Sequence, residues 1–150
     1  MKALVQRVSH AAVSSNGSPV GKIEQGLVVL LGVAKWDDER DVDYLVRKTV
    51  NLRVFEDEQG LLNKSVLDVK GSCLIVSQFT LYADTRRGNR PSFTDAATAE
   101  KSQQLYYKYV DAVRSAGVPV QTGVFQTHMM VDLCNDGPVT VMIESPYHCD

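Results

Sequence analysis

The sequence predicts an α/β protein in which mixed β-sheets form a barrel-like core and two or three helices pack outside it. Its 150 residues suit a single domain spanning residues 1–150, which is long enough to fold without disulfides or a structural metal. Strand-like runs outnumber the two segments that show helical periodicity. The elements run from hairpins through two helices to a strand-rich final third, and this order excludes a purely alternating βαβ fold.

Three strands are expected before the first helix. Residues 2–8 partly alternate apolar and polar side chains. The dipeptide Asn16-Gly17 is a strong hairpin signal and leads into a second strand over residues 20–23. Gly26 opens the continuous apolar run 27–34, which predicts a strand buried on both faces.

The helical segments are amphipathic. Behind Asp37 and Asp38, apolar residues recur at three- and four-residue spacing over about three to four turns. The longest helix is predicted over residues 96–116, capped by Thr94 or Asp95 and stopped by Gly117. The remaining predicted strands are 53–55, 61–62, 73–82, 118–125, 129–134 and 139–143.

Composition bounds the class of protein. The net charge of -2 argues against indiscriminate binding to nucleic acid, although it leaves room for a local basic patch. The N-terminal residues do not resemble a secretion signal, and run 27–34 is too short to cross a bilayer. Cys73, Cys134 and Cys149 are odd in number and form no CxxC pair, so neither a disulfide framework nor a zinc ribbon is expected. A cytoplasmic location follows.

Polar side chains follow the apolar stretch 74–76. In an extended strand, Ser77 and Phe79 would face one side, and Gln78 and Thr80 the other. Such a change from apolar to polar side chains can deliver hydrogen-bonding groups to a cleft. It can also mark only a strand that leaves the core and meets water.

A conventional serine hydrolase fits poorly. The sequence lacks a Gly-x-Ser-x-Gly elbow, and the available bases are His10, His128 and His148, which we interpret as surface or packing residues. The triplet His148-Cys149-Asp150 lies at the chain terminus, and adjacent ligands rarely converge on one ion, so no metal site is expected.

The segment Asn135-Asp136-Gly137-Pro138-Val139-Thr140 has two readings. Asp-Gly is a strong turn signal, so the segment can be an ordinary β-turn between two strands. Proline would then stand awkwardly at the start of the return strand. A cis Gly-Pro bond could instead turn neighbouring carbonyls to one side, as acceptors for an ammonium group.

The polar loop 84–95 carries three cations within five residues: Arg86, Arg87 and Arg90. They can be a solvated loop. They can equally contact phosphate, because the arginine fork matches phosphate geometry.

Taken together, these segments resemble the D-aminoacyl-tRNA deacylases, also called the D-tyrosyl-tRNA deacylase family. The similarity spans nearly the whole chain, and it is most specific in Ser77 to Thr80 and in Asn135 to Thr140. Neither motif departs from the family pattern. Residues 147–150 carry no family motif. The other similar segments are Gln6-Arg7-Val8, Gly26 to Gly32, Arg90-Pro91-Ser92-Phe93, Gln121-Thr122-Gly123, Phe125, Met129, Val131 and Leu133.

The resemblance implies a homodimer with two active sites at the subunit interface. In this family the Gly-Pro peptide is cis and reaches into the partner's site. Carried over, Gly137 and Pro138 would hold the substrate's α-amino group through their carbonyls and exclude an L side chain, while Arg7 and Asn135 support them.

The implied reaction is hydrolysis of the ester of D-aminoacyl-tRNA, and of glycyl-tRNA, which releases the amino acid and tRNA as translational proofreading. No cofactor is required, and neither DNA nor a membrane is an expected partner. Main-chain N–H groups around Phe79 and Thr80 would stabilise the oxyanion, with Gln78 in support. A ribose 2′-hydroxyl is the preferred activator of water. Phe125 and Met129 are assigned to the terminal adenine.

Two rival functions remain open at this point. A general esterase or peptidase would use Ser77 or Thr80 as a covalent nucleophile, but neither has a visible base. A non-catalytic RNA-binding or scaffold dimer would use the arginines of loop 84–95, although the net charge disfavours broad RNA affinity.

Overall fold

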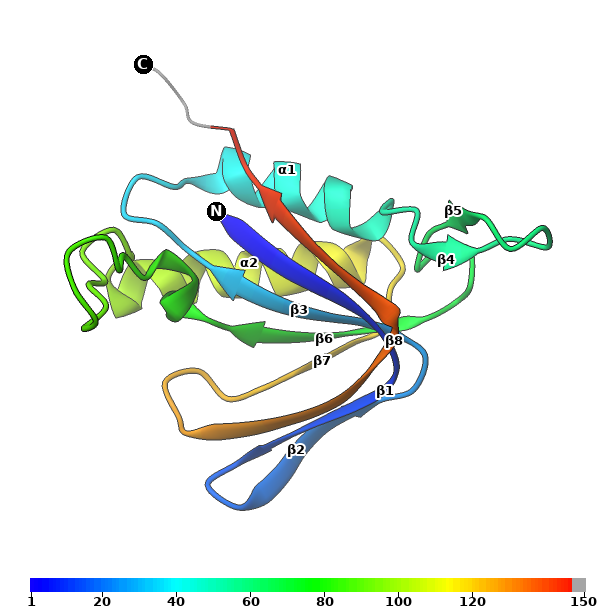
Figure 1. Cartoon of the computed structure of the whole chain (residues 1–150), viewed down its shortest axis with the longest axis horizontal. Coiled ribbons are helices and arrows are strands. Elements are labelled where there is room, and N and C mark those ends of the chain that lie inside the picture. Colours follow the sequence, from blue (N-terminus) through cyan, green and yellow to red (C-terminus); the bar gives the residue numbers. More distant parts are fainter. Residues whose placement is uncertain (147–150) are drawn as a thin grey trace.

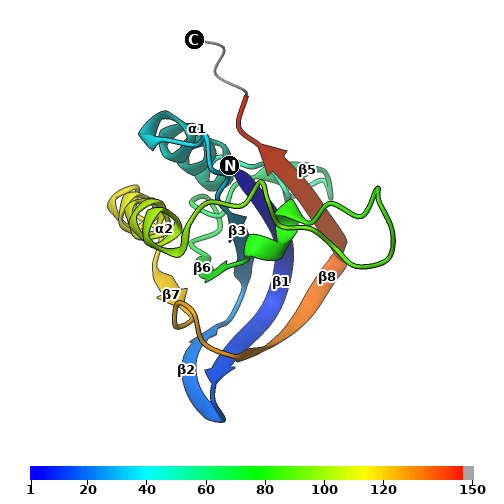
Figure 2. The same cartoon turned by 90° about the vertical axis from the view of Figure 1, so that its left-hand side faces the viewer.

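The computed structural model describes residues 1–146, so the triplet His148-Cys149-Asp150 and the tail 147–150 lie outside the described residues. The described residues form a strongly curved six-stranded mixed sheet, with two α-helices on one of its sides, and a separate two-stranded sheet (Figures 1 and 2). The elements are β1 (Lys2–Ser15), β2 (Ser18–Ile23), β3 (Gly26–Gly32), α1 (Glu39–Val50), β4 (Phe55–Glu56), β5 (Leu62–Lys64), β6 (Ser72–Ser77), the 3₁₀ helix η1 (Phe79–Tyr82), α2 (Ala99–Ser115), β7 (Val120–Thr122) and β8 (Met129–Glu144).

The sheet is nearly closed into a barrel-like shape. Its strand order is β2-β1-β3-β6-β7. Along β1, β3 pairs with residues 2–8 and β2 with residues 11–15, while β8 pairs with β1 over both stretches and therefore occupies the opposite edge. The pairs β3·β6 and β6·β7 are parallel, whereas β1 is antiparallel to β2, β3 and β8. A Cβ on Gly21 of β2 would stand 3.0 Å from the carbonyl oxygen of Thr122 of β7, so the two outer strands approach each other. The mixed, barrel-like sheet predicted from the sequence is therefore confirmed.

Glycine at position 26 allows β3 and β6 to come together. A Cβ there would lie 1.8 Å from the carbonyl oxygen of Ser72, well inside the contact distance of any two heavy atoms. Leu27, Val28 and Val29 follow with no exposed surface, as expected for a strand covered on both faces.

Two apolar clusters hold the layers together. The larger lies between the sheet and the helices and includes Leu45 of α1 and Tyr109 of α2, whose hydroxyl donates to Thr49 Oγ1 at 2.7 Å. The smaller includes Val8, Leu74 and Val76 and packs against Met129 and Leu133. Val76 and Met129 also line a cavity described below, so this second cluster adjoins that cavity.

Several predicted boundaries were wrong. The strand expected over residues 73–82 ends at Ser77 and gives way to η1. The two strands expected over residues 129–134 and 139–143 are one strand, β8. The second helix begins at Ala99, and its N-cap is Thr98, rather than Thr94 or Asp95. Helix α1 begins after Asp38, close to the expected start, and the side chain of Asp38 caps it.

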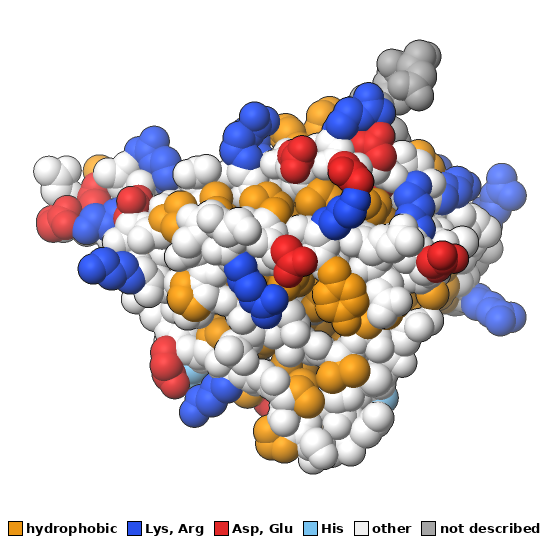
Figure 3. Space-filling view, turned by 180° about the vertical axis from the view of Figure 1, so that it is seen from behind, with side chains coloured by type: hydrophobic (Ala, Val, Ile, Leu, Met, Phe, Trp, Pro, Cys, Tyr) orange, Lys and Arg blue, Asp and Glu red, His pale blue; other side chains and the backbone are white. Residues whose placement is uncertain are grey.

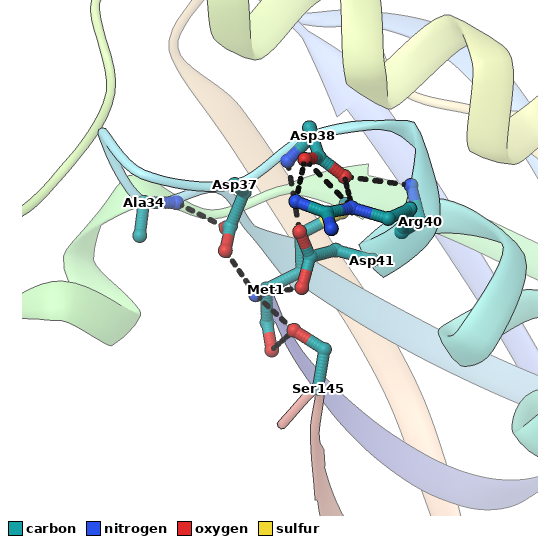
Figure 4. A network of polar contacts seen from close by, with 7 residues as sticks. All are labelled: Met1, Ala34, Asp37, Asp38, Arg40, Asp41 and Ser145. Carbon is teal, nitrogen blue, oxygen red and sulfur yellow. Dashed lines mark hydrogen bonds and ion pairs between the residues drawn. The ribbon is translucent and has the colours of Figure 1, made fainter. Parts of the chain in front are cut away.

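A buried ion pair joins three distant parts of the chain (Figure 4). The ammonium of Met1 donates to Asp37 Oδ1 at 2.7 Å and to Ser145 Oγ at 2.6 Å. The second oxygen of Asp37 accepts the N–H of Ala34 at 2.6 Å, and Asp41 Oδ1 lies 4.0 Å from the ammonium. The start of β1, the turn before α1 and the residue after β8 are thereby fixed to one another.

Candidate active site

The polar segment after β6 turns away from the sheet immediately. Ser77 is paired with Leu31 of β3, and the N–H of Gln78 makes the last bond to β3, donating to Leu31 O at 2.8 Å. From Phe79 onward the chain coils as η1. The strand-like alternation predicted for residues 77–80 is therefore wrong, because the strand ends at Ser77 and the side chains of Phe79 and Thr80 project from a 3₁₀ turn.

The turn at η1 leaves two main-chain donors available. The N–H of Gln78 is taken by Leu31, and the N–H of Leu81 donates to Gln78 O at 3.3 Å. Between them, the N–H groups of Phe79 and Thr80 are the first two of a helical turn, and such groups have no acceptor within the turn. Adjacent main-chain N–H groups that point to the same side can stabilise an oxyanion.

A cavity of about 440 Å³ is lined by Phe79, whereas Thr80, the next residue, does not line it. Five of the predicted site residues meet there: Ser77, Gln78, Phe79, Phe125 and Met129. The cavity's other lining residues are Val76, Ala97, Ala99, Ser102, Gln126, Thr127, His128 and Val131. Its size and its mixture of apolar and polar walls suit a small organic group such as a nucleoside.

Sequence reasoning missed Val76 of β6, Val131 of β8 and the residues of two further segments. In the first of these, Ala97 lies just before α2, and Ala99 and Ser102 lie in its first turn, where no polar motif marks them. The other segment, 126–128, lies between Phe125 and Met129. Its position between two predicted site residues was the one signal in the sequence that it lines the cavity. His128, interpreted as a surface or packing residue, is exposed at the cavity wall.

Hydrogen bonds and ring contacts position this second wall. Thr127 Oγ1 lies 2.6 Å from Ser15 Oγ and donates to Val124 O at 2.9 Å. The ring of Phe125 packs near that of Tyr106, with centroids 6.0 Å apart. The chain between β7 and β8 is thus attached to both β1 and α2.

The cavity offers no nucleophile with a base beside it. Within residues 1–146, no histidine or carboxylate hydrogen-bonds to Ser77 or Thr80, and Thr80 Oγ1 instead accepts from Gln78 Nε2. Cys73 is fully buried, and burial raises the pKa of its thiol to about 12, so it is a poor nucleophile. Among the described residues, the cavity therefore presents no side chain that is prepared for covalent catalysis.

Gly137 and Pro138 lie in a wide bulge of β8. Gln6 of β1 pairs with Thr140, and Val8 pairs with Asn135, so Arg7 alone stands opposite four residues of β8. The Gly137–Pro138 peptide is cis, as the resemblance implies. The expected turn between two strands is therefore a bulge within one continuous strand, in which residues 136–139 do not pair with β1.

Arg7 holds this bulge from the core side. The residue is 7% exposed, its Nε donates to Asp136 O at 3.0 Å, and its Nη1 donates to Val54 O at 2.7 Å. Asp136 Oδ2 lies 3.7 Å from Nε and adds an ion pair. A planar guanidinium can satisfy several carbonyls at fixed angles, which lysine cannot do.

The bulge and the cavity lie apart within one chain. Arg7 pairs with Leu27 of β3, whereas Ser77 is paired with Leu31, four residues further along. That separation amounts to about 13 Å along the strand. Neither Gly137 nor Pro138 lines the cavity.

The loop arginines are also outside the cavity. Arg86 is held by Asp84, with Nη2 2.7 Å from Oδ2, and the hydrogen bond from Arg86 holds the pKa of the Asp84 carboxyl at about 2. Arg87 and Arg90 are exposed. Acidic and basic side chains are interspersed on the face shown in Figure 3, without a large region of one sign. The loop is attached to the site by Phe93, whose ring meets that of Phe79 at 5.0 Å.

Comparison with known proteins gives the family. A family model described as D-Tyr-tRNA(Tyr) deacylase matches residues 4–144. The chain belongs to this deacylase family. Among its relatives, the D-aminoacyl-tRNA deacylase of Fervidobacterium nodosum is 54% identical over 145 residues, which cover 97% of each chain. That of Symbiobacterium thermophilum is also 54% identical over 145 residues, covering 97% of this chain and 96% of the relative.

Two solved structures show the same architecture. A c-Myc DNA unwinding element binding protein is 41% identical, with a TM-score of 0.93, and the match covers 98% of this chain and 100% of that one. A probable eukaryotic D-amino acid tRNA deacylase has a TM-score of 0.81 at 15% identity, with coverage of 96% and 98%, and shares the fold. Within residues 1–146, no helix of this deacylase-family chain is long and apolar enough to cross a membrane.

Proposed function

We propose that this chain hydrolyses the ester bond of D-aminoacyl-tRNA and glycyl-tRNA, releasing the free amino acid and tRNA as a proofreading step in translation. Members of the deacylase family are hydrolases that act on aminoacyl-tRNA. The observation that supports the proposal most directly is the start of η1 after the last bond to β3, where Phe79 lines the cavity and the N–H groups of Phe79 and Thr80 have no acceptor within the turn. The protein would act in the cytoplasm, without a cofactor.

The terminal adenosine would occupy the cavity, with its base between Phe125 and Met129. The ester carbonyl would then face the N–H groups of Phe79 and Thr80, which stabilise the negative charge that develops on its oxygen. The adjacent ribose 2′-hydroxyl would help to activate water. This route explains why a site without a paired nucleophile and base could still cleave an activated ester.

The side-chain hydroxyls should be dispensable. Ser77→Ala and Thr80→Ala are expected to reduce kcat/KM for a D-aminoacyl-tRNA by at most about 10- to 100-fold, an effect on the scale of lost hydrogen bonds. Steady-state kinetics on variants with unchanged unfolding midpoints would measure this effect. An inactive but folded variant, together with an acyl adduct trapped on the wild type, would instead favour a covalent esterase.

The separation of the bulge from the cavity supports a homodimer, in which Gly137–Pro138 of one subunit enters the cavity of the other. We expect Gln78→Ala to damage the cavity. Gly137→Ala should damage the bulge, because its Cβ would meet Val139 Cγ2 at 2.8 Å at a φ of +132°.

Mixing the two variants should restore activity. Half of a random mixture is hybrid, and each hybrid has one intact pair of segments, so about one quarter of the wild-type rate is expected. The measurement is turnover after subunit exchange, with each variant alone as the control. A wild-type enzyme that remains monomeric by light scattering during turnover would contradict the model of a shared site.

The proposed reaction is tested by comparing D-Tyr-tRNA, D-Asp-tRNA, Gly-tRNA and L-Tyr-tRNA under one set of conditions. If main-chain carbonyls at Gly137 and Pro138 accept hydrogen bonds from the substrate's amino group, the backbone blocks the position of an L side chain on the α-carbon and leaves the position of a D side chain open. Both D substrates and Gly-tRNA should then be cleaved, and the L substrate spared. Efficient cleavage of L-Tyr-tRNA, or cleavage of D-Tyr-tRNA alone, would show that side-chain recognition governs.

A further inference from the structure

The neck of the β8 bulge is closed by side chains. We define the neck as Asn135 and Thr140, the residues at which β8 leaves and rejoins β1. Asn135 Nδ2 donates to Thr140 Oγ1 at 2.9 Å, and Gln6 Nε2 of β1 donates to the same oxygen at 3.3 Å. Asn135 Oδ1 accepts the main-chain N–H of Val139 at 3.1 Å. The amide of Asn135 therefore links both ends of the bulge, and Gln6 attaches the neck to the sheet.

The bulge is held from both faces of the sheet. Successive side chains of a strand point to opposite faces, so Gln6 lies on the face opposite to Arg7. Arg7 binds the carbonyl of Asp136, which precedes Gly137, whereas the neck binds the N–H of Val139, which follows Pro138. The two main-chain atoms that flank Gly137–Pro138 are thus held by different side chains, and both sets of bonds position the same two-residue element.

We propose that Gln6 and Thr140 are positioning residues for chiral selection, because closing the neck sets where the Gly137–Pro138 main chain stands in the site that it enters. This inference rests on the proposed function. Hydrogen bonds at these partly exposed positions contribute only modestly to stability, so geometry should be their main effect. Exclusion of an L side chain by main chain is sensitive to small displacements of that main chain, since a misplacement of about 1 Å can reduce a rate by about 100-fold.

Thr140→Val keeps the shape of the side chain and removes the oxygen that accepts both bonds. It should lower kcat/KM for D-Tyr-tRNA by about 10-fold. It should also lower the ratio of kcat/KM for D-Tyr-tRNA to kcat/KM for L-Tyr-tRNA by at least the same factor. Thr140→Ser restores the hydroxyl and should recover most of both losses. Gln6→Met should act in the same direction more weakly, because its bond is the longer one.

Ser9→Ala is the matched control. Ser9 lies on the same strand and makes an exposed side-chain contact, with Oγ 3.2 Å from His10 Nδ1, but it does not contact the neck. This variant should keep the wild-type rate and the wild-type ratio. Urea unfolding of all variants separates a change in selectivity from a loss of fold; if Thr140→Val does not fold, Gln6→Met decides the question.

A double-substitution cycle provides a second readout. Arg7→Ala and Thr140→Val act on the same two-residue element, so their combined loss should be smaller than the product of the single losses. An unchanged D to L ratio in folded Thr140→Val and Gln6→Met would overturn the inference, even if both lose stability. A wild-type enzyme that fails to cleave any D-aminoacyl-tRNA would overturn the proposed function instead.

Discussion

Replacing Arg7 with alanine should lower kcat/KM for D-Tyr-tRNA by about 100-fold or more while leaving the fold intact. The bulge would lose its bond at Asp136 O, and a displacement of about 1 Å in a reacting group can cost a rate factor of that size. The carbonyl of Val54 would also lose its partner, which should reduce the free energy of unfolding by about 1–3 kcal/mol.

Kinetics and urea unfolding of the same variant would separate these two effects. Arg47→Ala provides the control, because Arg47 is an exposed arginine on α1 far from the bulge in sequence. Arg7→Lys should resemble Arg7→Ala more than the wild type, because a lysine cannot reproduce the two-carbonyl geometry. Wild-type kinetics for folded Arg7→Ala would show that the bulge needs no support from the core side.

The largest effect on stability is expected from Asp37→Asn. The substitution would leave the ammonium of Met1 buried without its nearest carboxylate, and removal of one partner from a buried ion pair typically costs about 3–5 kcal/mol. Asp41, at 4.0 Å, offsets part of this cost.

The free energy of unfolding in urea measures the effect. Asp43→Asn is the matched control, since Asp43 is exposed on α1 and should change stability by less than about 0.5 kcal/mol. Equal stability of Asp37→Asn and wild type would mean that the ion pair only offsets the cost of burying its own charges.

Local patterns predicted the elements that local physics controls. Helix α1 begins after its capping aspartate, and the hairpin between β1 and β2 turns at Asn16 and Gly17, both with positive φ. The buried run after Gly26 became β3. In each case, capping or turn chemistry and apolar periodicity lie within a few residues of one another.

The sequence could not predict features that depend on distant partners. Residues 2–8 were expected to form a short strand, but β1 continues to Ser15 because β8 pairs along its length. Because β8 pairs with β1 on both sides of Gly137–Pro138, it is one strand, and these two residues form a bulge in it. At the cavity, Ser77 and Phe125 come together through β6 and the segment before β8, while the start of α2 carries no signal at all.

The pairing of β1 with β8 also sets the order in which the fold can form. β1 has its neighbours β2 and β3 as soon as the first third of the chain is synthesised, but its other edge waits for a strand that ends at Glu144. Pairings of such long sequence separation form slowly, and an unpaired edge can recruit other chains. A nascent chain on the ribosome therefore exposes this edge until nearly all of the protein has been made. Chaperone binding to the nascent chain and its aggregation should consequently persist until β8 has left the ribosome and paired with β1, whether or not the helices have already folded.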